Sequence, residues 1–112
     1  MSDTATEGTD FVQATLKVLG GKWKILILWH LRDDAKRFNE LKRLMPTISE
    51  KVLTQQLREL ERDGLVLRLT HPSKSPKVEY MFTEYGRTLM PVLQALCLWG
   101  ERHLAQQTPA ST

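Results

Sequence analysis

The segment from Ser49 to Asp63 gathers five hydrogen-bond donors, three of them positively charged, at helical spacing. At about 100° per residue these donors fall on one side of a predicted helix, and leucines fall roughly opposite. The acidic residues of the segment flank the donor side, and none lies within it. The donors are Lys51, Thr54, Gln55, Arg58 and Arg62, and the leucines are Leu53, Leu57 and Leu60. Most charge clusters on helices are only solvated surface, but a face of donors without carboxylates is suited to contact a polyanion.

The neighbouring residues predict the elements that would position this helix. Residues 38–45 repeat apolar side chains at helical spacing until a proline ends a first helix, and the second helix follows at 49–63. Residues 65–70 and 78–83 then alternate apolar and polar side chains, as the two strands of a hairpin do. A helix, a turn, a second helix and a hairpin form a winged helix-turn-helix, and residues 35–37 can add a short edge strand. The sequence therefore predicts an α+β, mainly α fold.

The start of the second helix has two possible caps. Thr47 can form a capping box with Glu50, and Ser49 can cap the helix directly. The sequence leaves both open. Gly64 follows Asp63 as a C′ glycine, which frees the chain to turn into the hairpin.

The positions of the donors suggest different roles in binding DNA. Thr54 and Gln55 lie in the first half of the helix, where base edges are usually reached, and Gln can pair with adenine through two hydrogen bonds. Arg58 could read guanine or hold a phosphate. Arg62, near the C-terminal end, suits a phosphate contact or a surface ion pair.

The predicted wing, residues 71–77, is also basic. It carries Lys74 and Lys77, and no acid interrupts the run from Arg68 to Lys77, which favours contact with phosphates or the minor groove over a merely solubilising loop. The predicted helix over residues 38–45 carries two further candidates, Lys42 and Arg43. For both, a solvated helix face is an equal alternative.

Helices near both ends of the chain extend this core. Residues 22–31 are apolar on nearly every side and are expected to form a central helix. A helix over 11–19, capped by Asp10, precedes it. After the hairpin, Thr83 is expected to cap a last helix, which Pro91 should kink because proline removes a backbone donor.

The two terminal helices carry more apolar surface than one small domain can cover. This surplus predicts an oligomer, most simply a C₂ homodimer, so both are treated as dimerisation helices added to the winged helix-turn-helix. The predicted interface residues are Phe11, Leu93, Leu96 and Trp99. The chain then divides into a disordered tail (1–9), one domain (10–105) and a flexible tail (106–112).

Composition narrows the function classes. The 112 residues have a net charge of +3 and a pI of about 9.2; three of the 13 acids lie in the first ten residues, so residues 11–112 carry +6. This balance favours a polyanionic partner, although a basic soluble domain without one is an equal alternative on charge alone. The residues show no catalytic, metal or cofactor motif, and neither a leader nor a membrane-spanning run, so we expect a cytoplasmic protein that is not an enzyme.

The single cysteine excludes an internal disulfide. Cys97 lies within the apolar run of the last helix, without a base in the turn before it to favour its thiolate. We therefore expect a small buried hydrophobic side chain rather than an oxidant sensor.

The chain resembles the HxlR-type transcriptional regulators, a MarR-like branch of the winged-helix proteins, over about residues 11–103. The motifs that carry the resemblance are Gly20-Gly21-Lys22-Trp23, Arg37-Phe38-Asn39-Glu40-Leu41, the run from Leu53 to Val66, Val78-Glu79-Tyr80, Thr83-Glu84-Tyr85-Gly86-Arg87 and Trp99-Gly100. Many members of this family carry a cysteine just before the first helix, in some cases an oxidant sensor. Here Thr9-Asp10-Phe11-Val12 stands in that place.

The resemblance implies a dimeric regulator that places its second helix in the major groove of double-stranded DNA and its wing on the flanking backbone. Together with the residues, it predicts a homodimer that binds a pseudo-palindromic operator and represses transcription. The alternative is a winged-helix module for protein–protein assembly. A small-molecule effector is compatible with the first hypothesis, but the sequence leaves its existence and identity open.

Overall fold

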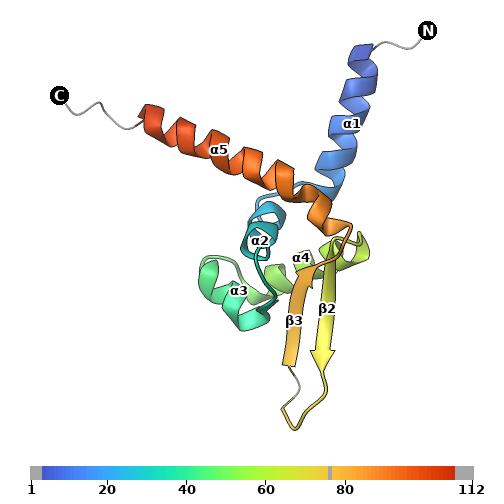
Figure 1. The fold of residues 1–112 in the computed structure, drawn as a ribbon, viewed down its shortest axis with the longest axis vertical. Coiled ribbons are helices and arrows are strands. Elements are labelled where there is room, and N and C mark those ends of the chain that lie inside the picture. The colour runs from blue at the N-terminus through green and yellow to red at the C-terminus, as the bar shows by residue number, and fades with distance from the viewer. Residues whose placement is uncertain (1–3, 76, 108–112) are drawn as a thin grey trace, which may run out of the picture.

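The computed structural model describes residues 4–75 and 77–107 and forms a winged helix-turn-helix, so the predicted mainly helical fold with a small sheet is confirmed. In chain order the elements are α1 (Thr4–Leu19), α2 (Lys24–His30), β1 (Lys36–Arg37), α3 (Phe38–Leu44), α4 (Glu50–Arg62), β2 (Val66–His71), β3 (Lys77–Phe82), the 3₁₀ helix η1 (Gly86–Leu89) and α5 (Met90–Gln107). The sheet is antiparallel in the order β1-β3-β2, and β2 and β3 form the wing (Figure 1). Among the described residues no helix is long and apolar enough to cross a membrane.

The leucine side of α4 forms the centre of the core. Leu53, Leu57 and Leu60 are each at most 1% exposed, and they join the buried Ile27 and Leu28 of α2 in one cluster. Burying a side chain of this size stabilises the fold by about 1.5–3 kcal/mol. Because this side of α4 is fixed against the core, the opposite side must face outward.

The ends of α4 are set by local interactions. The hydroxyl of Ser49 accepts a hydrogen bond from the backbone N–H of Val52 at 3.1 Å, so Ser49, and not Thr47, is the cap. At the other end Gly64 has a φ of +77°, a conformation that favours glycine and turns the chain into β2. Both helix ends therefore lie within a residue of the prediction.

The first helix begins earlier than predicted. The sequence predicts a disordered tail over residues 4–9 and a cap at Asp10, but α1 is already helical from Thr4. Alanine and glutamate have high intrinsic helix propensity, and residues 4–9 contain both, which favours the extension. At the other end α5 continues to Gln107, two residues into the predicted flexible tail. Residues 1–3 and 108–112 lie outside the described residues.

The last helix is also entered differently. A 3₁₀ turn replaces the predicted first turn after Thr83, and Pro91 is the second residue of α5 rather than an interior one. In the first turn a proline leaves no hydrogen bond unmade, so it helps to start the helix where a kink was predicted.

The helices α1 and α5 project from the winged body on the side away from the wing tip and diverge from each other (Figure 1). The radius of gyration is 17.2 Å, whereas a compact chain of this length has about 13 Å. Phe11 is 72% exposed and Trp99 is 67% exposed. The chain therefore leaves large apolar side chains of both helices uncovered.

Two predictions about α5 fail for the same reason. Leu93, predicted to lie in an interface, is 1% exposed and belongs to the chain's own core. Cys97, predicted to be buried, is exposed. Only the beginning of α5 touches the body, so the apolar stripe is covered at Leu93 and uncovered one turn later.

Thr83 and Gly86 attach the root of α5 to the body. The Thr83 hydroxyl donates to the carbonyl of Gly64 at 2.6 Å and accepts from the backbone N–H of Gly86 at 2.8 Å. A β-carbon on Gly86 would lie 2.1 Å from the carbonyl oxygen of Leu65. This close approach of two backbones requires glycine.

We predict that Gly86→Ala destabilises the protein by about 3 kcal/mol, because the added methyl group must push η1 away from Leu65. Urea unfolding monitored by circular dichroism measures the change. The matched control is Gly8→Ala in α1, where an added methyl group meets nothing within 4 Å and should be neutral or stabilising by up to about 1 kcal/mol. Equal stability of the two variants would contradict the proposed role of Gly86.

Candidate nucleic-acid interface

The outward side of α4 carries the predicted donors together. Lys51, Gln55, Arg58 and Arg62 are exposed and Thr54 is half-buried. All five line one open hollow along the helix. Glu50 and Glu59, two of the acids that flank the donor side, also line this hollow.

A second cleft, of about 450 Å³, separates α4 from the wing. Thr54, Arg58 and Glu61 line it from α4, and Arg68 and Tyr80 line it from the hairpin. Arg68 and Tyr80 are directly opposite in the strand register, so their side chains share the face of the hairpin that looks toward α4. Two guanidinium groups from different elements therefore meet at one cleft.

Tyr80 is a candidate that sequence reasoning missed. Its alternation with Phe82 placed it on the buried face of a strand, where an aromatic side chain suggests only packing. The structure leaves it half-buried, at the edge where the core ends and the cleft begins. Only the pairing of Tyr80 with Arg68 reveals this position, and strand register is not readable from the sequence.

The wing presents its lysines to solvent. Lys74 and Lys77 are exposed, and the neighbouring His71 Nε2 lies 2.8 Å from Glu79 Oε1. Glu79 therefore has a partner on its own hairpin. Pro76, inside the predicted wing 71–77, lies outside the described residues.

The two further candidates in α3 are less suited to DNA contact. Lys42 Nζ donates to the carbonyl of Pro46 at 3.2 Å, two residues after the end of its own helix. Arg43 is exposed but borders a hollow that Glu40 and Glu79 also line. Neither residue lines the two hollows described above for the donors of α4.

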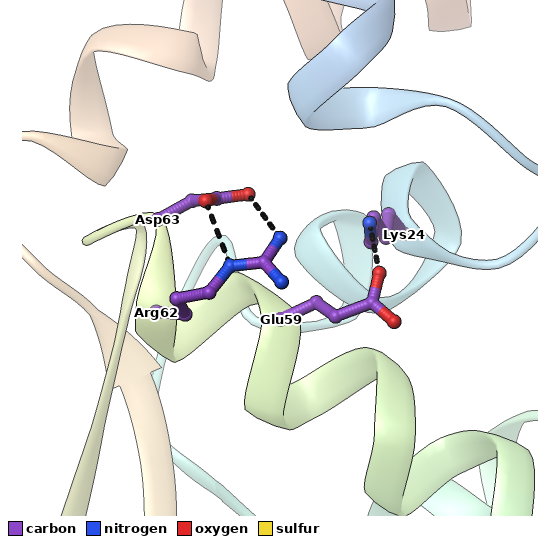
Figure 2. A network of polar contacts seen from close by, with 4 residues as sticks. All are labelled: Lys24, Glu59, Arg62 and Asp63. Carbon is purple, nitrogen blue, oxygen red and sulfur yellow. Dashed lines mark hydrogen bonds and ion pairs between the residues drawn. The ribbon is translucent and has the colours of Figure 1, made fainter.

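Arg62 forms an ion pair with the residue that follows it. Its Nε lies 3.3 Å from Asp63 Oδ1 and its Nη2 lies 3.5 Å from Asp63 Oδ2 (Figure 2). The neighbouring carboxylate raises the pKa of Arg62. Of the two roles that the sequence left open, the surface ion pair is the one observed in the free chain.

A side-chain ion pair joins α2 to α4. Lys24 Nζ lies 2.6 Å from Glu59 Oε1, 35 residues away, and the Lys24 side chain is 7% exposed (Figure 2). The hydrogen bond from Lys24 is the main cause that lowers the pKa of Glu59 below its ordinary value of 4.5. Lys24 is not among the site residues predicted from the sequence. Its helical spacing with Ile27, Leu28 and Leu31 is the signal in the sequence that indicates an inward-facing side chain.

The lowered pKa of Glu59 predicts a dependence of stability on pH. A carboxyl group with a lowered folded-state pKa stabilises the fold above its unfolded pKa, here about 4.5, and loses that contribution as the pH falls through the folded-state value. We predict that Glu59→Gln loses less stability than the wild type between pH 6 and pH 3, approximate limits set by that pKa. Urea unfolding at each pH measures this, with Glu84→Gln, at an exposed glutamate, as the control. Parallel pH profiles for Glu59→Gln and the wild type would contradict the prediction.

Comparison with known proteins identifies relatives along most of the chain. The model of the family described as HxlR-like helix-turn-helix matches residues 18–108. The chain is 57% identical over 93 residues to the uncharacterized HTH-type transcriptional regulator YtcD of Bacillus subtilis, covering 83% of this chain and 74% of that protein. It is 44% identical over 96 residues to an uncharacterized HTH-type transcriptional regulator of Methanothermobacter thermautotrophicus, covering 86% of this chain and 73% of that protein.

Solved structures agree with these relatives. The crystal structure of YtcD superimposes with a TM-score of 0.80 at 55% identity, covering 84% of this chain and 96% of that one. The reduced form of the redox regulator HypR gives a TM-score of 0.80 at 48% identity, covering 86% and 97%. A MarR-family regulator of Enterococcus faecalis gives 0.76 at 36% identity, covering 96% and 94%.

Proposed function

The chain belongs to the HxlR-like helix-turn-helix family of transcriptional regulators, which are DNA-binding proteins and not enzymes, and from this premise we propose that it is a homodimeric repressor that binds a pseudo-palindromic operator. The donor side of α4, rigidly held by the buried leucines behind it, is the observation that carries the proposal. As a DNA-binding regulator it acts where the DNA is, in the cytoplasm.

The geometry supports insertion of α4 into the major groove. The helix has 13 residues, so it is about 20 Å long, and a major groove about 12 Å wide admits one helix. Thr54 and Gln55 lie in its first half and would meet base edges, whereas Lys51 near its start would meet a phosphate.

The cleft between α4 and the wing supports a backbone contact. A DNA strand that leaves the major groove passes the wing, where Arg58, Arg68 and the hydroxyl of Tyr80 would surround a phosphate. Lys74 and Lys77 extend this positive surface along the hairpin. The wing would thereby fix the register of α4 in the groove.

The uncovered apolar side chains of α1 and α5 support the dimer. Five large apolar side chains of these two helices are between 46% and 72% exposed: Phe11, Leu16, Leu96, Trp99 and Leu104. Single exposed apolar residues are normal on a monomer, but so many on two helices indicate a surface that a partner covers. A C₂ axis between the projecting helices would cover them and present two α4 helices to one duplex, about 34–36 Å apart or a multiple of it. A dimer bound over a promoter blocks polymerase without any further contact, which makes repression the simplest mode of action.

We predict that Arg58→Ala weakens binding to the preferred operator by about 1–3 kcal/mol if Arg58 reads a base, and by less if it holds a phosphate. Lys77→Ala should weaken all sequences alike and make the salt dependence shallower by about one unit of slope. Fluorescence anisotropy at several salt concentrations measures both effects on a duplex selected by the wild type from a random pool.

The control for these variants is Lys17→Ala, which removes an exposed positive charge from the polar side of α1. Its affinity should equal that of the wild type. If Arg58→Ala and Lys77→Ala also bind as the wild type does, α4 and the wing do not contact DNA. A wild type that shows no salt-dependent binding to any duplex would favour the assembly module instead.

We also predict that Leu96→Asp and Trp99→Asp convert the protein to folded monomers, because each places a carboxylate in the apolar surface that the dimer would bury. Sedimentation equilibrium at micromolar concentration measures the mass. Gln94→Asp, at an exposed residue about 160° from Leu96 around α5, is the control and should remain a dimer. A wild-type mass of one chain would refute the dimer directly.

A further inference from the structure

Lys24 occupies a position that α2 alone does not explain. It is the first residue of a seven-residue helix, where the positive end of the helix dipole disfavours a lysine. It is also buried, on the side that packs against the core. A buried ammonium group requires a partner, and the partner is Glu59 of α4 (Figure 2).

Glu59 lies where the buried side of α4 meets the donor side. It is four residues after Gln55 and three before Arg62, so all three are neighbours on the helix surface and line the same hollow. An uncompensated carboxylate at this position would repel the phosphates of a duplex. The ion pair with Lys24 removes most of that repulsion and fixes the carboxylate in one place.

We propose that Lys24 and Glu59 are positioning residues for sequence recognition: Lys24 fixes Glu59, and Glu59 in turn orients the side-chain amide of Gln55 toward the base edge. The inference rests on the proposed function, since it concerns how the α4 face reads DNA. A glutamine has several rotatable bonds, and a fixed carboxylate that accepts from its N–H₂ group leaves the amide oriented before binding.

The electrostatics of Glu59 agree with this arrangement. After the dominant effect of Lys24, a hydrogen bond with the Gln55 side chain also lowers the pKa of Glu59. Arg62 contributes a weaker attraction from the other side. Glu59 is therefore charged at neutral pH, paired with a buried cation, and one turn after the side chain assigned to base reading.

The DNA experiment compares Gln55→Ala, Glu59→Ala, Lys24→Met and Lys24→Arg on one set of duplexes: a sequence selected by the wild type from a random pool and all its single-base-pair variants. Gln55→Ala should reduce discrimination at one base pair by about fivefold or more, since a two-hydrogen-bond contact discriminates by roughly that factor at least. Glu59→Ala and Lys24→Met should reduce discrimination at the same base pair. Lys24→Arg, which keeps the positive charge, should retain more of that discrimination than Lys24→Met does.

Double variants separate positioning from general damage. In the Gln55→Ala background, Glu59→Ala should cause no further loss of discrimination, because its effect passes through Gln55. A merely structural role would weaken all duplexes by one common factor and leave the preference unchanged, and that result would overturn the inference while leaving the proposed function intact. If the wild type selects no sequence, the proposed function fails, and the inference fails with it.

A second measurement needs no DNA and confirms that the variants are folded. In ¹H–¹⁵N spectra, the side-chain amide signals of Gln55 should shift with the titration of Glu59, and the midpoint should move to higher pH in Lys24→Met. The backbone amide signals report the fold of each variant. If the chemical shifts of the Gln55 side-chain amide do not change as Glu59 titrates, the inference is overturned.

Discussion

The burial of one side of α4 is the constraint on which the rest of the molecule depends. Leu53, Leu57 and Leu60 leave only one orientation of the helix about its own axis, because rotating it would expose leucines and bury arginines. The same packing that stabilises the fold therefore selects the residues that face outward. The proposed recognition of DNA by α4 needs no separate structural element to hold the helix rigid, since the core of the protein supplies the rigidity.

A domain this small cannot bury the apolar sides of its terminal helices in the same way. The winged body covers Leu19 at the end of α1 and Leu93 near the start of α5, and beyond these residues both helices extend past the body. Their apolar stripes continue outward from the core without a surface to pack on. The proposed dimer extends the same core across a symmetry axis, which is why the free chain is so far from spherical.

The sequence predicted what local periodicity determines and missed what distant contacts determine. The bounds of α4 and of the hairpin followed from leucine spacing, Gly64 and strand alternation. The entry to α5 did not follow, because Thr83 bonds to Gly64, 19 residues away, and redirects the chain into a 3₁₀ turn. The predicted burial of Cys97 was wrong, because an apolar run indicates that a side of the helix packs against another surface. The run does not indicate whether that surface belongs to the same chain.

The pairing of charges separates the residues that stabilise the free protein from those available for a ligand. Arg62 is engaged by Asp63, and the acid at the rim, Glu59, is engaged by Lys24. Arg58 and Lys51, in the part of the chain that the structure describes, have no such ion pair, although Glu61 lies one turn after Arg58 and Glu50 directly precedes Lys51. Arg58 is exposed at a cleft and has no ion pair to break before it binds a phosphate, whereas Arg62 must first release Asp63. Of these two arginines of α4, Arg58 is therefore better suited to bind the duplex. The proposed recognition then depends on Glu59 being held by Lys24, outside the donor side, so that the donors next to Glu59 stay available.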